Sequence, residues 1–343
     1  MRPTHSSEVA PALRPSGSTE PGPGTRAPAS APTGEVYSGL RAVRTVAMLS
    51  IVAYHVEWRP DREPDPIFGV SFGLTALQVI MCALIARHPV APRFGKFAAR
   101  RARRLLVPWA FWSAAYIVVD VLLSLRYGHA WWTPFHRSMI FKGGSFHLWF
   151  LLYGFAASLV VLCGLRACEG SRARVAIPLA AGLGALLVLF GTTLNVALTP
   201  PDPFQLWLDG SAAVAFGLAI GRALSLPGAR ERLGWLALIS VLAVLPMLVG
   251  PDLAPHSQLW SRYGIAVPLA CAGFLVRVPE SRLLVFLASC NLGVYAVHIL
   301  SLRLVNRIPW LDDFSEPLRI GAVYAISLLA IALLRRTRLR PVA

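Results

Sequence analysis

The sequence predicts an all-α fold, a polytopic bundle of about ten transmembrane helices with both termini in the cytoplasm. Two observations predict it. Hydrophobic residues make up 55% of the 343 residues and charged residues only 15%, which is too apolar for a soluble chain of one or two domains. The apolar residues also form continuous runs of roughly 17–25, the length of a helix that crosses ~30 Å of hydrocarbon. A membrane β-barrel would instead need short strands of alternating polarity.

Ten runs are candidate membrane spans. The clearest cover residues 39–56, 67–86, 105–125, 147–165, 175–198, 233–250 and 318–334. Three others contain polar residues: 204–221 contains Asp209, 258–276 contains Arg262, and 283–302 contains Asn291 and His298. An even number of spans leaves both termini on the same side of the membrane.

The basic residues give the orientation, because lysine and arginine in short loops resist translocation. With the N-terminus inside, most of the 33 lysines and arginines fall in inner segments, and the outer loop after the first span is acidic. The predicted location is the cell membrane, in contact with membrane lipid. The net charge of +16 lies at the inner ends of apolar segments rather than on a polar face, so the sequence predicts no nucleic-acid partner.

Composition divides the chain into three parts. Residues 1–36 are rich in Pro, Ala and Ser and have no apolar core, so they are expected to form a disordered cytoplasmic tail. Residues 37–335 form the predicted membrane domain, and 336–343 a basic cytoplasmic tail. The five cysteines lack the spacing of a zinc site, so no metal is predicted.

The first span, "GLRAVRTVAMLSIVAYHV", carries Arg41 and Arg44 near one end and His55 near the other. Arg44 and His55 are eleven residues apart, close to three helical turns, so they share one face ~16 Å apart along the axis. Charge in lipid is costly, so this face is expected to line the bundle interior or a wet cavity. The alternative is that both arginines snorkel to the inner headgroups while His55 sits at the outer interface.

Two further histidines fall at the same predicted outer level as His55. His147 begins the span "HLWFLLYGF", and His298 ends the span containing "LGVYAVHIL". Histidine is the usual general base near neutral pH, so a base that activates a hydroxyl is plausible chemistry for this level. For His147 and His298, packing or hydrogen bonding is the competing interpretation.

A basic cluster precedes the third span in "KFAARRARRLLVPW". Arg101 and Arg104 are three residues apart and lie on one helical face, an arrangement that suits a phosphate-rich ligand. The competing interpretation is the ordinary positive charge at the inner end of a span.

Together these residues resemble a known family, the bacterial acyltransferase-3 membrane proteins, which move an acyl group, most often acetyl, onto hydroxyls of sugars and other acceptors. The resemblance rests on Arg44-x10-His55, on the Arg101-x2-Arg104 pair, and on the two stretches from His147 and around His298. It covers approximately residues 36–335. The chain departs from the family at Arg41, where many members carry an aspartate, so an ion pair at this helix start must be rebuilt or absent.

The resemblance implies a role for each of these residues. His55 would be the catalytic base with Arg44 as its partner, and Arg101 and Arg104 would bind the donor. Possible site-lining residues are His147, Trp149, Tyr295 and His298. The donor would be acyl-CoA, with acetyl-CoA the commonest in the family, as a co-substrate rather than a bound cofactor. The acceptor would be a hydroxyl-bearing sugar or natural product, and the chain is expected to be a stand-alone O-acyltransferase module.

A transporter of small molecules or lipid-linked sugars is the alternative, because about ten helices with polar residues inside the membrane also fit that class. Its substrate or ion contacts would be Asp120, Asp209 and Asn291. These residues lie on separate predicted helices, and the two halves of the sequence show no convincing repeat.

Overall fold

A computed structural model describes residues 37–57, 72–88, 91–168, 172–253, 258–308, 310, 315–337, 339 and 342. The predicted disordered tail, residues 1–36, lies outside these ranges, as do the acidic loop after the first span and part of the predicted basic tail at 336–343. Residues 37–343 form one compact unit. Within the described residues the regular structure is entirely helical.

Ten of the described helices have 15 residues or more: α1 (Ser38–Glu57), α2 (Phe72–Ala86), α3 (Phe94–Arg126), α5 (Trp149–Ala167), α6 (Ala173–Leu198), α7 (Phe204–Leu224), α8 (Ala229–Leu253), α9 (Leu259–Leu275), α10 (Arg282–Val305) and α12 (Glu316–Leu334). A short helix α4 (Met139–Lys142) and a 3₁₀ turn η1 (Phe146–Leu148) precede α5. Seven of the described helices are long and apolar enough to cross a membrane, namely α3, α5 with η1, α6, α7, α8, α10 and α12. The chain is thus a multi-pass membrane protein, while the full count of about ten spans and the orientation stay predictions.

Three of the predicted spans are not among these seven. Helices α2 and α9 are apolar but shorter, at 15 and 17 residues. Helix α1 is 20 residues long, but Arg41, Arg44 and His55 lower its mean hydropathy.

Two of the helix starts that differ from the predicted spans affect predicted site residues. Helix α3 begins at Phe94, so Arg101 and Arg104 lie inside it; Ala and Arg favour helix, and its polar first turns extend the apolar span. Helix α5 begins at Trp149, and His147 lies in the 3₁₀ turn before it. The preceding Gly143 has a positive φ of 80° and Ser145 is extended, which prevents the helix from beginning earlier.

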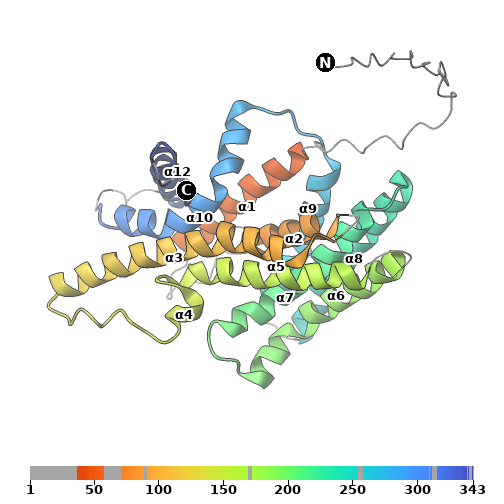
Figure 1. The fold of residues 1–343 in the computed structure, drawn as a ribbon, viewed down its shortest axis with the longest axis horizontal. Helices are drawn as coiled ribbons and strands as arrows, with labels where there is room; N and C mark the ends of the chain where they lie inside the picture. The colour runs from red at the N-terminus through yellow and green to blue at the C-terminus, as the bar shows by residue number, and fades with distance from the viewer. Residues whose placement is uncertain are drawn as a thin grey trace, which may run out of the picture. The chain divides into compact units, whose positions relative to one another are not determined.

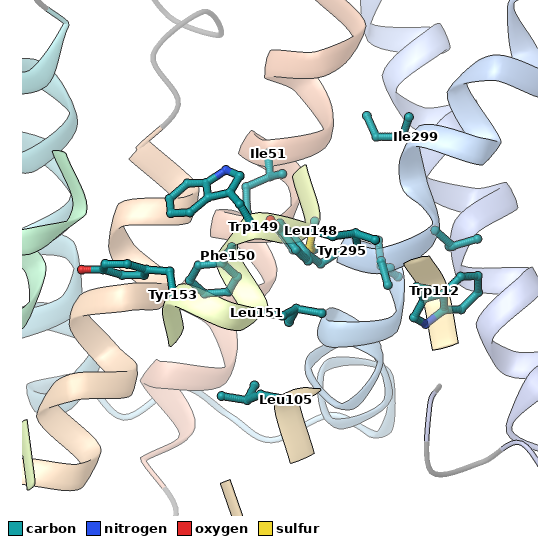
Figure 2. Packing of buried hydrophobic residues seen from close by; sticks show 14 of the residues in the cluster. Ile51, Leu105, Trp112, Leu148, Trp149, Phe150, Leu151, Tyr153, Tyr295 and Ile299 are labelled. Carbon is teal, nitrogen blue, oxygen red and sulfur yellow. The ribbon is translucent and has the colours of Figure 1, made fainter. Parts of the chain in front are cut away.

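Helix α2 is central to the packing. It contacts α1, α5, α7 and α9, and ten of its 15 residues are buried (Figure 1). An apolar helix with no polar face is expected in such an interior position. Helix α10 packs between α1 and α12, and the apolar core that joins it to α5 includes Phe150, Leu151, Tyr295 and Ile299 (Figure 2).

The outward surface of the bundle is apolar. On α6 the exposed large side chains recur every three or four residues, as one stripe: Val175, Leu179, Leu183, Leu186 and Phe190. Such a stripe is expected on a helix that faces lipid rather than water. The backbone polar groups of the helix are paired within it, so only apolar side chains meet the lipid.

Gly217 and Gly221, in "GLAIG" on α7, allow α7 to approach α2 closely. A Cβ atom at either position would overlap Cβ of Cys82 or of Ala86 on α2. This small-x3-small spacing is typical of close helix pairs in membranes. The α2–α7 contact therefore depends on the missing side chains.

We expect Gly217→Val to destabilise the bundle by about 1–3 kcal/mol or more, because it overpacks this contact. The measurement is the thermal unfolding midpoint of the purified protein in detergent. Gly182→Val on α6 is the control, since a side chain there meets open space. Equal midpoints for the two variants would contradict the close contact.

Candidate active site

Three histidines from separate elements meet near one end of α1. The His298 ring on α10 lies 5.0 Å from the ring of His55 on α1 and 5.0 Å from that of His147 in η1, between ring centroids. We call His55, His147 and His298 the histidine cluster. His147 and His298 are buried and His55 is half-buried, so His55 is the most accessible of the three.

Backbone carbonyls fix the two buried imidazoles. His298 Nδ1 lies 2.7 Å from the Tyr295 carbonyl, which can only accept, so Nδ1 carries the hydrogen. His298 Nε2 is then left without a hydrogen-bond partner among the described residues. His147 Nε2 donates to the Ala296 carbonyl at 3.3 Å, and its Nδ1 accepts from the Ser145 hydroxyl at 3.0 Å.

A cavity of about 180 Å³ leads from three arginines to the neighbourhood of the cluster, and we call it the inner cavity. Arg44 lines it together with Arg101 and Arg104, and Tyr295 lines it as well. The Tyr295 ring lies 5.5 Å from that of His147 and 5.9 Å from that of His298, and its hydroxyl donates to the His147 carbonyl. Tyr295 therefore belongs both to the cavity wall and to the surroundings of the histidines.

The inner cavity shares part of its wall with a cavity of about 340 Å³, the basic cavity. Arg101 and Arg104 line both, and Arg100 and His88 line the basic cavity. Burial, and then the charges of Arg87 and Arg101, lower the pKa of His88, so its imidazole is neutral at pH 7. The positive charge of this region thus comes from its arginines.

The arginines of the inner cavity have no carboxylate partner. Arg44 donates to the Ala288 carbonyl at 3.5 Å, and Arg101 lies over the Phe97 ring. None of Arg44, Arg101 and Arg104 forms a salt bridge with any residue in the described ranges. Arg44 and Arg101 are half-buried and Arg104 is exposed, so three guanidinium groups gather around one cavity without counter-charges from the described residues, and a ligand with anionic groups would supply them.

Arg41, where the resemblance led us to expect an aspartate, forms an ion pair. Its Nη1 lies 2.6 Å from Glu280 Oε1, in the segment before α10. The ion pair at the start of α1 is therefore rebuilt with a different partner, and Arg41 does not line the inner cavity.

A wide cavity of about 460 Å³ adjoins the histidine cluster. Its wall includes Ser145, which is hydrogen-bonded to His147, and Phe146, whose ring is 5.4 Å from that of His55. Asp120 and Arg303 also line it and form an ion pair at 2.5 Å. The histidines thus contact the walls of two cavities, one rich in arginine and one with mixed polar groups.

The structure brings most of the predicted site residues together. His55, His147, His298 and Tyr295 form one group, and Arg44, Arg101 and Arg104 line the cavity that approaches it. Trp149 lies apart: its ring packs against Tyr153 at 5.6 Å, and Figure 2 shows it directed away from Tyr295.

Sequence reasoning did not assign Ser145, Phe146 or Arg303 to the site. Ser145 lies only two residues before His147, so its position in the sequence could have assigned it to the site. Arg303 has no such signal, because its partner Asp120 is 183 residues away in the sequence.

The sequence also shows which protein family the chain belongs to. The sequence profile of the acyltransferase-3 family, described as an acyltransferase domain, matches residues 37–336. The chain belongs to the acyltransferase-3 family. Searches of curated proteins and of solved structures gave no significant match. The matched range contains every helix described above, so the acyltransferase-3 domain is the whole helical unit and the two cavities beside the histidines are parts of it.

The three polar residues that the transporter alternative named lie in different cavities of this acyltransferase-3 domain. Asp120 lines the wide cavity, Asn291 lines the inner cavity, and Asp209 lines a third cavity considered below. They form no single group across the described part of the bundle.

Proposed function

We propose that the protein is an O-acyltransferase that moves an acetyl group from acetyl-CoA to a hydroxyl of a carbohydrate or glycosylated natural product. The observation that carries this proposal is the set of Arg44, Arg101 and Arg104, which line one cavity without a carboxylate partner among the described residues. Coenzyme A supplies phosphate groups for such a set and a thin arm that fits a narrow cavity. Family membership supports the acyltransferase chemistry.

The donor occupies the basic and inner cavities in this proposal. Its phosphates bind at Arg100, Arg101 and Arg104, and its pantetheine arm extends through the inner cavity toward Tyr295. The thioester then lies at the histidine cluster. The predicted orientation places the basic cavity on the cytoplasmic side, where acyl-CoA is made.

The acceptor occupies the wide cavity, and His55 is the general base. As the acceptor oxygen attacks the thioester carbonyl, its proton passes to the His55 imidazole and a carbon–oxygen bond forms. The carbon–sulfur bond then breaks, and the departing sulfur takes the proton from the His55 imidazolium. The products are an O-acyl ester and free CoA, and His55 returns to its neutral state.

Arg44 serves the donor in this scheme rather than the reacting carbonyl. It lines the inner cavity with Arg101 and Arg104, and ~16 Å of helix α1 separate it from His55. We expect Arg44→Gln to raise the Kd for acetyl-CoA about tenfold or more, because it removes a charge-assisted contact. Two measurements separate a role in donor binding from a role at the reacting carbonyl: the equilibrium Kd for acetyl-CoA, and the single-turnover rate of acyl transfer at saturating acetyl-CoA.

The matched control for Arg44→Gln is Arg174→Gln. Arg174 is exposed and pairs with Glu231 at 2.9 Å, away from all three arginines of the cavity. An unchanged donor Kd in Arg44→Gln, with a slower single-turnover rate, would assign Arg44 to the transition state instead.

The direct test of the function is transfer of label from acetyl-CoA. Membranes containing the protein are supplied with acetyl-labelled acetyl-CoA, and alkali-labile ester label is measured in the carbohydrate fraction. We expect label above that of membranes without the protein. A folded protein that neither binds acetyl-CoA nor forms ester would overturn the proposal and favour transport.

A further inference from the structure

A third cavity, lined by residues of α6, α7 and α9, is unexplained by the donor and acceptor sites. It has a volume of about 500 Å³, and its wall is mostly polar: Thr192, Asn195, Thr199, Gln205, Asp209, Gln258 and Arg262 line it beside two apolar residues. We call it the amide cavity. Asn195, Asp209 and Arg262 lie within α6, α7 and α9, and because polar groups inside membrane helices are costly, their gathering points to a ligand.

The two charged residues of the amide cavity do not pair with each other. No salt bridge joins Asp209 and Arg262 within the described part of the chain. Asp209 Oδ1 accepts from Asn195 Nδ2 at 2.5 Å, and Arg262 donates to the Gln258 side chain at 3.2 Å. Arg262 Nε and Asn195 Oδ1 are buried without a hydrogen-bond partner in the described residues. Asn195 and Arg262 thus keep hydrogen-bonding capacity that the described part of the chain does not use.

The side chains of the cavity wall indicate which class of ligand would bind there. One carboxylate and one guanidinium give no net charge, and three side-chain amides supply both donors and acceptors. Hydroxyl groups, which donate and accept at once, complement such a wall. The guanidinium of Arg262 disfavours a metal cation, and the Asp209 carboxylate disfavours a phosphate.

The amide cavity and the wide cavity are linked through the start of α7. Lys142, which lines the wide cavity, forms an ion pair with Asp202, and the rings of Phe141 and Phe204 are 5.0 Å apart. Gln205, the next residue after Phe204, lines the amide cavity. The walls of the two cavities are therefore joined by direct contacts.

A second contact joins α7 to α5, the helix that follows His147. Tyr153 on α5, six residues after His147, donates to the carbonyl of Gly210, the neighbour of Asp209. The amide cavity is therefore at the same end of α5 as the histidine cluster.

We propose that the amide cavity is a subsite for a neutral, hydroxyl-rich unit of the acceptor, a sugar residue remote from the hydroxyl that is acylated. This inference rests on the proposed function and deepens it, because it predicts an acceptor with at least two glycosyl units. The remote unit binds through Asn195, Asp209 and Arg262 while the reacting unit lies in the wide cavity.

The test is glycan binding by the full-length protein in lipid nanodiscs, measured on an array of neutral mono- and oligosaccharides without acyl-CoA. We expect the wild type to retain a subset of oligosaccharides, and Asp209→Asn with Arg262→Gln to weaken this binding about tenfold or more. Gln205→Ala, which changes an exposed wall residue, tests the site with little risk to folding. Glu231→Gln, which removes a carboxylate at the start of α8, is the control.

Two results would overturn the subsite: a wild type that binds no neutral glycan, or wall variants that remain folded by thermal unfolding and keep the wild-type glycan profile. Acetyl-CoA binding and ester formation are measured on the same preparations. If these persist while the wall variants bind glycans normally, the proposed function stands and the subsite fails. If glycans bind through the wall but acetyl-CoA does not bind, the amide cavity remains a glycan site while the proposed acyl transfer, and with it the role as an acceptor subsite, fails.

Discussion

Replacing His55 by glutamine is expected to lower the rate of acyl transfer by about 10²–10⁴-fold, the usual contribution of a general base. His55 is the most accessible member of the cluster. Both ring nitrogens of His147 are hydrogen-bonded, and one of those of His298 is. The nitrogens of His55 bond to no residue in the described ranges, and its ring contacts Phe146 in the wall of the wide cavity.

The donor should still bind when His55 is changed, because His55 lines neither the basic cavity nor the inner cavity, where the arginines lie. The measurements are therefore the acetyl-CoA Kd and the single-turnover rate of ester formation, both in detergent. Tyr54→Phe is the matched control, since its ring is 5.2 Å from that of His55 and only a hydroxyl is lost. A His55→Gln rate equal to that of the control, with His298→Gln inactive, would transfer the role of base to His298.

Much of the fold follows from local sequence, because a membrane helix is specified by its own apolar length. The seven helices that meet the length and hydropathy criteria correspond to predicted spans. The start of a helix was less predictable where polar residues extend it before the apolar span, as in the part of α3 that precedes Leu105. The start of α5 depends on Gly143, whose positive φ is a property of the folded backbone rather than of hydropathy.

The candidate site was predictable in its residues but not in its assembly. Each of His55, His147 and His298 lies at the predicted outer end of its span, so the sequence predicts that they share one depth in the membrane. Whether they contact one another depends on which helices are neighbours. That arrangement arises from packing, for example of α10 against α1, for which no local signal exists. The same reason explains why the sequence predicted Arg44 on the face of His55, ~16 Å away, but not that Arg44 on α1 lines one cavity with Arg101 and Arg104 of α3.

The double change Arg101→Gln and Arg104→Gln is expected to have the largest effect on donor binding. Both arginines line the basic and inner cavities, so each change removes a charge that has no carboxylate partner in the described chain. Two charge-assisted contacts of this kind together change an affinity by about 10²-fold or more. The measurement is the acetyl-CoA Kd of purified protein over a range of salt concentrations.

The salt dependence distinguishes a phosphate site from an ordinary inner-face cluster. Binding through guanidinium and phosphate groups should weaken as salt rises, and the double variant should lose most of this dependence. Arg93→Gln with Arg103→Gln is the matched control, because both side chains are exposed near the same end of α3 and line neither cavity. It removes the same charge from the same side of the membrane. If both double variants bind acetyl-CoA alike, the arginines serve only to orient the helix, and the donor must enter by another route.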